Sequence, residues 1–186
     1  MNAVSTDRKY TLRARAERQE ETRRRIVEVT ERLHREVGPA RTTIAEIARR
    51  ARVERLTVYR NFPSNSELFG ACQALFLSNS PPPGIAADVE GTLLGWYEWY
   101  RANQDMVRNV QRDRRSLSEL DDLLRSTSDV GLDRTAQALA GNDPRTEQLI
   151  RVALEFTTWD LLAGRGVSDQ EIARLFADAV RGSGGR

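Results

Sequence analysis

The sequence predicts an all-α protein, and three observations support that fold class. Apolar residues recur at three- and four-residue spacing along most of the 186 residues, which is the period of an amphipathic helix. Capping residues, glycines and prolines separate these stretches, and no segment alternates apolar and polar residues as a half-buried strand does. With 39% hydrophobic and 30% charged residues, the chain has the mixed composition of a soluble protein with a core of its own.

The amino-terminal part of the chain divides into four expected helices. Their ranges are 17–37, 44–51, 55–61 and 65–79. Gly38 and Pro39 end the first helix. Thr43 and Glu46 predict a capping box at the start of the second, in which a hydroxyl and a carboxylate satisfy backbone N–H groups. Pro63 ends the third helix, because the residue before a proline avoids the helical region.

The rest of the chain is expected to form five more helices. Their ranges are 88–103, 105–114, 116–140, 144–163 and 169–181. Two further capping boxes, Ser64 with Glu67 and Ser168 with Glu171, mark helix starts. No internal repeat is visible, and the chain between its expected arm and tail is predicted to be all-α.

Charge is unevenly distributed along the chain, although the net charge is only +2. Residues 1–65 hold 16 Arg and Lys against 9 Asp and Glu, whereas residues 66–186 hold 13 against 18. The basic segment favours a polyanionic partner, because binding to phosphates releases condensed counterions. On charge alone, a solvated surface, a membrane or an acidic protein remain alternatives.

The third expected helix carries apolar residues on two faces. Val58 and Phe62 lie one turn apart and predict a face packed on the first two helices. Leu56 and Tyr59 lie among arginines on the other faces. A short helix that presents cations and apolar groups from a three-helix scaffold fits a helix-turn-helix, whose second helix enters the DNA major groove. The alternative is that Leu56 and Tyr59 are core residues of a longer bundle.

The run from residue 42 to residue 69, TTIAEIARRARVERLTVYRNFPSNSELF, resembles the DNA-binding signature of the TetR/AcrR family of transcriptional regulators. The features that match are the threonine cap of the second helix, Ile47-Ala48, Val53, Thr57-Val58-Tyr59 and Phe62-Pro63-Ser64. The resemblance implies a homodimeric repressor whose carboxy-terminal domain binds a small molecule and thereby releases a DNA operator.

The resemblance also implies roles for individual residues. Thr43 falls where the family binds a phosphate with a hydroxyl or N–H group at a helix start. The positions that approach bases are Ala45, Arg55, Leu56 and Tyr59, with Arg55 the foremost candidate. The positions that grip the DNA backbone are Thr57, Arg60 and Asn61, with Asn65 at the exit of the motif.

Three residues depart from the family pattern. Arg52 stands where a glycine is usual, so it must adopt a left-handed conformation or reshape the turn. Glu54 replaces a hydroxyl residue at the cap of the third helix, and Asn65 replaces a lysine. The last two changes remove favourable electrostatics toward phosphates. The basic residues of the amino-terminal arm are expected to compensate for them, namely Arg8, Lys9, Arg13, Arg15 and Arg18.

These observations give an expected domain organisation. Residues 1–18 form a basic, flexible arm, 19–66 a helix-turn-helix DNA-binding domain, 67–182 a helical regulatory and dimerisation domain, and 183–186 a flexible tail.

The regulatory region contains aromatic residues that are expected to line a ligand pocket. The candidate ligand-binding residues are Trp96, Trp99, Tyr100, Met106, Phe156, Trp159 and Asp160. An apolar wall with a few polar groups is the usual character of a small-molecule site, and Asp160 would supply a charged contact. The alternative is that these aromatic side chains are plain core.

Dimerisation is expected through the last two helices. The helix at 144–163 is apolar on most sides, and the helix at 169–181 carries a broad apolar stripe, so a partner subunit would cover the excess. A two-fold dimer would place two recognition helices roughly 34–36 Å apart on a near-palindromic operator.

No catalytic, metal-binding or cofactor-binding constellation is visible in the sequence. The single histidine, His34, is expected on a helix surface, and Cys72 is expected to pack in a core. A single cysteine and the lack of a signal-like apolar segment favour the cytoplasm. Two rival functions remain, a ligand-independent DNA-binding regulator controlled by a protein partner and a small all-α enzyme with an anionic substrate.

Overall fold

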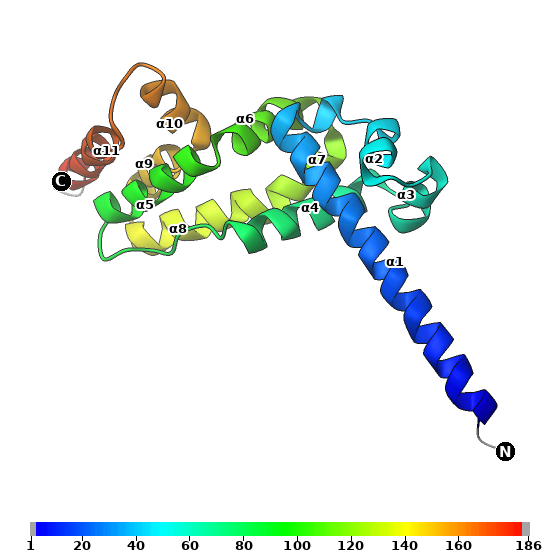
Figure 1. The fold of residues 1–186 in the computed structure, drawn as a ribbon. Helices are drawn as coiled ribbons and strands as arrows, with labels where there is room; N and C mark the ends of the chain where they lie inside the picture. Colours follow the sequence, from blue (N-terminus) through cyan, green and yellow to red (C-terminus); the bar gives the residue numbers. More distant parts are fainter. Residues whose placement is uncertain (1–2, 184–186) are drawn as a thin grey trace. The chain divides into compact units, whose positions relative to one another are not determined.

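The computed structural model describes residues 3–183, with side chains from residue 13 onward, and every regular element in that range is helical (Figure 1). The elements are α1 (Ala3–Glu36), η1 (Pro39–Arg41), α2 (Ile44–Ala51), α3 (Arg55–Asn61), α4 (Asn65–Asn79), α5 (Val89–Ala102), α6 (Gln104–Asp113), η2 (Arg114–Ser116), α7 (Ser118–Leu124), η3 (Arg125–Asp129), α8 (Val130–Ala140), α9 (Pro144–Ala153), α10 (Phe156–Ala163) and α11 (Asp169–Ser183). The predicted all-α fold class is confirmed. Among these elements, none combines the length and apolar character of a transmembrane helix.

The chain divides into two compact units, Met1–Asn79 and Ser80–Arg186. In the first unit, α1 to α4 share one hydrophobic core, which α1 enters with Ile26, Val29 and Leu33. These three residues follow the three- and four-residue spacing of the predicted apolar stripe. The carboxy-terminal half of α1 is therefore the platform on which the shorter helices pack.

The expected flexible arm at 1–18 is helical from Ala3 onward and continues into α1 (Figure 1). Residues 12–18 explain the difference, because their Leu, Arg, Ala and Glu all favour helix. Arg13 and Glu17 add an ion pair of 3.0 Å between successive turns. The side chains of Arg8 and Lys9 lie outside the described residues, as do residues 184–186 of the expected tail.

The first unit extends through α4 to Asn79, whereas the sequence placed the domain boundary after residue 66. Leu68 and Cys72 of α4 are buried in the same core as α1. The thiol sulfur of Cys72 lies 3.9 Å from the carbonyl oxygen of Val27. Because α4 buries its apolar side against α1, it is part of the first unit's core.

The second unit has its own core, built by α5, α8, α9, α10 and α11. The helix predicted at 144–163 is divided there into α9 and α10. The hydroxyl of Tyr97 donates to the carbonyl oxygen of Ala153 at 2.9 Å, and that of Tyr100 to Leu154 at 2.6 Å. These bonds satisfy two carbonyl groups at the end of α9 that a continuous helix would have bonded, so the break leaves neither orphaned.

The helix predicted at 116–140 is also divided, into α7 and α8 with a wide π-helical turn, η3, between them. Arg114 is bonded to Asp129 at the end of that turn, with Nη2 2.8 Å from the carboxylate. It also donates from Nε to Asp121 of α7 at 2.8 Å. One guanidinium group therefore holds both sides of the π turn.

Candidate nucleic-acid interface

The second helix of the first unit begins as the sequence predicts. Thr43 is its N-cap, and its hydroxyl oxygen accepts a hydrogen bond from the Glu46 N–H at 3.2 Å. The reciprocal half of the expected capping box is absent from the described contacts of Glu46, whose carboxylate instead binds Arg49 and Arg50, both at 2.6 Å. Hydrogen bonds from these two arginines hold the pKa of Glu46 at about 2, below its ordinary value of 4.5.

The turn that leads to the third helix contains a left-handed residue. Arg52 has φ 53° and ψ 50°, and it is the one non-glycine residue with positive φ in the described chain. Its N–H donates to Arg49 at 3.3 Å, and the Val53 N–H donates to Ala48 at 3.0 Å. This pair of bonds is a Schellman motif, which ends α2 and turns the chain into α3. Of the two outcomes expected for Arg52, the left-handed conformation is the one observed.

The third helix, α3, begins and ends where the sequence predicts and has two distinct faces. Val58 and Phe62 are buried in the core of the first unit. Leu56 and Tyr59 are 53% and 54% exposed. The alternative that these two residues belong to the core is therefore excluded within the monomer. Their exposed neighbours on α3 are Arg55 and Arg60.

Residues 26–72 match the family model described as bacterial regulatory proteins, tetR family. These residues are a TetR-family helix-turn-helix domain. The match begins in the part of α1 that forms the core and ends in α4, so it covers the scaffold as well as α2 and α3. A comparison with curated proteins finds no match.

The TetR domain identifies the chain as a DNA-binding regulator of transcription. The family is one of regulators and not of enzymes, so the alternative of a small all-α enzyme with an anionic substrate is set aside. Among residues 13–183, whose side chains are described, no group of His, Cys, Asp and Glu has the arrangement of a metal site. His34, expected on the surface, is only 5% exposed, and its ring lies 5.8 Å from that of Phe69. The first helix faces the core on more sides than its apolar spacing indicated.

One contact that supports the TetR recognition helix was not predictable from local sequence. Arg23 of α1 donates a short hydrogen bond from Nη1 to the carbonyl oxygen of Asn61, the last residue of α3. The same guanidinium group lies 4.1 Å from the centre of the Phe62 ring. A cation at a helix carboxy terminus satisfies a free carbonyl and opposes the helix dipole. Arg23 therefore fixes the end of α3 to α1.

The other DNA-contact candidates lie around this helix. Thr43, Arg55, Arg60 and Asn65 are exposed, and Ala45, Thr57 and Asn61 are half-buried. The Asn61 side chain donates from Nδ2 to the carbonyl oxygen of Thr57 at 2.8 Å. Glu54 is the N-cap of α3 but makes no capping bond through its side chain. The carboxylate of Glu54 is thus exposed beside the helix start, as its departure from the family pattern suggested.

The aromatic candidates in the second unit lie in one cluster. Successive ring centres from Trp96 through Tyr100 to Phe156 and Trp159 are 5.3–5.7 Å apart. Trp99 contacts Trp96 and Tyr100, and Met106 is buried. The structure therefore brings the aromatic candidates together, as a packed group of rings.

Two members of the candidate set have polar features of note. The Trp96 indole N–H is buried and has no hydrogen-bond partner among the described residues. Asp160 accepts from Arg108 Nη2 at 2.5 Å and from Gln104 at 3.2 Å. Burial alone would raise the pKa of Asp160, but these hydrogen bonds lower it, so the carboxylate stays ionised.

Proposed function

We propose that the protein is a homodimeric transcriptional repressor that binds a near-palindromic operator through α3 and is released by a small molecule bound in the second unit. The observation that carries the proposal is the outer face of α3. Leu56 and Tyr59 leave more than half of their surface exposed beside Arg55 and Arg60. Large apolar groups among cations on a short, firmly held helix suit a major groove, where arginine binds guanine and apolar atoms contact thymine methyl groups.

The proposed contacts follow from the position of each residue. Arg55, Leu56 and Tyr59 approach base edges, with Ala45 of α2 beside them. The proposed phosphate contacts are Thr43, Thr57, Arg60, Asn61 and Asn65. The hydroxyl oxygen of Thr43 is occupied by its capping bond, but its O–H can still donate to a phosphate. The exposed Arg15 and Arg18 on α1, with Arg13, are proposed to add contacts to the DNA backbone.

Exposed leucines in the second unit support dimerisation through the last two helices. Leu161 of α10 and Leu175 of α11 are 56% and 57% exposed, and α10 packs against α11. A partner subunit that covered both side chains would stabilise the dimer by roughly 2 kcal/mol per leucine, because their apolar surface would leave water. A two-fold axis there is proposed to pair the two domains for half-sites one DNA turn apart.

The small-molecule part of the proposal rests on the aromatic cluster. The buried indole N–H of Trp96 lacks an acceptor in the part of the chain that the structure describes, and such orphaned donors are rare in folded proteins. A polar group of a ligand could accept from it while the rings of Trp99 and Tyr100 contact an apolar part. A repressor acts where the chromosome lies, so the proposed location is the cytoplasm.

Selection of bound sequences from random DNA by the full chain tests the DNA-binding proposal. A near-palindrome with half-sites one turn apart is expected. Arg55→Ala should then weaken operator binding by about 1–3 kcal/mol and relax specificity at one base step. Arg60→Ala should weaken binding to all DNA sequences alike and reduce the slope of log affinity against log salt concentration by about 1. Arg134→Ala, at an exposed position of α8, is the matched control and should change neither.

Two results would contradict the proposed roles. Selection that yields no preferred sequence argues against specific recognition by α3. An equal loss on every sequence for Arg55→Ala makes that residue a phosphate contact. Addition of candidate small molecules to the operator complex then separates a ligand-released repressor from a regulator controlled by a protein partner.

A further inference from the structure

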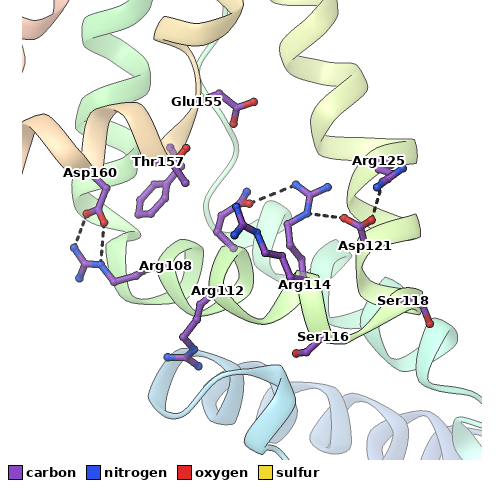
Figure 2. Close-up of a pocket in the computed structure, with 13 residues that line it drawn as sticks. Arg108, Arg112, Arg114, Ser116, Ser118, Asp121, Arg125, Glu155, Thr157 and Asp160 are labelled. Atoms are coloured by element: carbon purple, nitrogen blue, oxygen red, sulfur yellow. Dashed lines mark hydrogen bonds and ion pairs between the residues drawn. The ribbon is translucent and has the colours of Figure 1, made fainter.

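The second unit contains an open cleft of about 1260 Å³ beside the aromatic cluster (Figure 2). Its walls come from α6, η2, the start of α7 and η3, and the beginning of α10. Phe156 and Asp160 line it, so the cleft adjoins two of the expected ligand-binding residues. Phe156 is the one apolar side chain of the lining and is itself buried. A purely apolar ligand would therefore find little surface to cover there.

Arginine dominates the lining of this cleft, which we name the arginine cleft. Five arginines line it, namely Arg108, Arg112, Arg114, Arg115 and Arg125, against three carboxylates. Residues 66–186 as a whole have the opposite balance, with 13 basic against 18 acidic residues. Two of these arginines are paired with carboxylates outside the lining, Arg112 with Asp113 at 2.6 Å and Arg114 with Asp129 at 2.8 Å, so the positive charge open to an anion comes mainly from Arg115 and Arg125.

The three carboxylates of the arginine cleft already have cationic partners. Asp160 is paired with Arg108 at 2.5 Å (Figure 2). Asp121 binds both Arg114 at 2.8 Å and Arg125 at 2.7 Å. Glu155 is paired with Arg151 at 2.6 Å. The hydrogen bond from Arg114 also lowers the pKa of Asp121, so this group remains ionised and occupied. The acidic residues therefore offer little to a cation.

Several guanidinium donors, in contrast, are left for a ligand. Arg115 is exposed and has neither an ion-pair nor a hydrogen-bond partner in the described chain. Arg125 reaches Asp121 through Nε, and its side chain remains 72% exposed. A guanidinium group has five N–H donors in a fixed fork that matches a carboxylate or a phosphate. Ser116 and Thr157 add exposed hydroxyl groups to the same lining.

We propose that the arginine cleft binds a small polyanion, either a polycarboxylate or a phosphate ester, through Arg115 and Arg125. Both residues border the region where Arg114 holds the π turn η3 to η2 and α7. An anion bound there would accept hydrogen bonds from guanidinium groups beside the one that holds the π turn. We propose this anion as the small-molecule effector, a role that rests on the proposed function.

Isothermal titration of the full chain with citrate and with pyrophosphate, at matched ionic strength, tests the site. The two probes distinguish carboxylate from phosphate chemistry. Arg115→Gln and Arg125→Gln should each weaken the preferred probe by about tenfold or more, because each removes hydrogen bonds between charged groups. Arg115→Lys keeps the charge and should recover part of the loss. Arg134→Gln, an exposed arginine of α8 outside the cleft, should bind like the unchanged protein.

The proposal is overturned if neither probe binds the unchanged protein more tightly than chloride does. It is also overturned if the two Gln variants and Arg134→Gln bind alike. Circular dichroism confirms that each variant is folded. Operator binding by the unchanged protein is measured separately without added anion. If the protein binds the probe but no DNA, the proposed repressor function is contradicted while the anion site is supported. Probe binding that leaves operator affinity unchanged at matched ionic strength contradicts the effector role.

Discussion

Replacement of Arg52 by glycine is expected to stabilise the helix-turn-helix. Arg52 holds a left-handed conformation, in which its Cβ is too close to the backbone, at a cost of about 1–2 kcal/mol. Glycine adopts this conformation without that strain, but it loses more conformational entropy on folding, by roughly 0.5–1 kcal/mol. The net stabilisation expected for Arg52→Gly is therefore about 0.5–1 kcal/mol.

The rest of the turn should survive the substitution. The two Schellman bonds involve backbone atoms of Arg52 and Val53, so neither depends on the side chain. The Arg52 side chain is exposed and makes no ion pair or hydrogen bond among the described residues, so its removal costs no contact. The stability of Arg52→Asn should lie between those of the unchanged protein and Arg52→Gly, because asparagine tolerates the left-handed region better than most residues.

Amide hydrogen exchange of the full chain is the suitable measurement. All three tryptophans lie in the second unit, so tryptophan fluorescence would not report on α2 and α3. An increase of 1 kcal/mol in the free energy of unfolding slows amide exchange through unfolding by about fivefold. This slowing is expected in peptides that cover residues 44–62. Peptides from the second unit act as the internal reference.

Arg52→Ala separates backbone strain from charge. Alanine keeps the Cβ and removes the cation that stands near Arg49 and Arg50. If alanine slowed exchange as much as glycine does, relief of charge repulsion would explain the gain and the conformational reasoning would be refuted.

Four further predictions concern other parts of the chain. Arg23→Ala should destabilise the end of α3 by about 1–2 kcal/mol, seen as faster amide exchange there, because a carbonyl partner and a cation–π contact are lost. Glutamate at both Leu161 and Leu175 should convert the proposed dimer to a monomer in analytical ultracentrifugation, and a persistent dimer would refute that interface. Burial raises the pKa of the Cys72 thiol to about 12, so iodoacetamide at pH 8 should modify it only when urea unfolds the protein. Because the pKa of Glu46 is lowered to about 2, its ion pairs should stabilise the fold fully above pH 4.5, and this stabilisation should be lost as the pH falls toward 2. A pKa near 4.5 for Glu46, measured by NMR titration, would contradict this.

Elements with strong local signals were predicted well from the sequence. The third helix begins at Arg55 and ends at Asn61, as expected, because Pro63 and the cap position define its ends locally. The separation of its faces also followed from residue spacing alone, since Val58 is buried and Leu56 exposed.

Features that depend on distant residues were not predictable in this way. The break between α9 and α10 is accompanied by hydroxyl groups of Tyr97 and Tyr100, more than 50 residues earlier in the chain. Arg23 reaches the carbonyl of Asn61 across 38 residues. Neither contact leaves a mark in the local pattern, because helical spacing records which side of a helix is apolar and not which polar atom meets it.

The capping boxes show how neighbours decide the outcome of one local motif. Ser168 and Glu171 form the complete box, since the Glu171 carboxylate accepts from the Ser168 N–H at 2.9 Å and Ser168 Oγ accepts from the Glu171 N–H at 3.3 Å. Glu46 has the same spacing from its threonine cap, but arginines three and four residues later compete for its carboxylate.

This competition has a consequence for DNA binding. Arg50 is also paired with Glu36 of α1 at 2.6 Å, so both cations at the end of α2 are partly neutralised by carboxylates of the same unit. The excess of 16 basic over 9 acidic residues in residues 1–65 therefore overstates the positive field that α2 presents. The Arg55 side chain has no ion-pair or hydrogen-bond partner among the described residues. It therefore presents its full charge beside the exposed Leu56 and Tyr59. The cations at the end of α2 are thus partly neutralised, whereas Arg55 of the recognition helix is not.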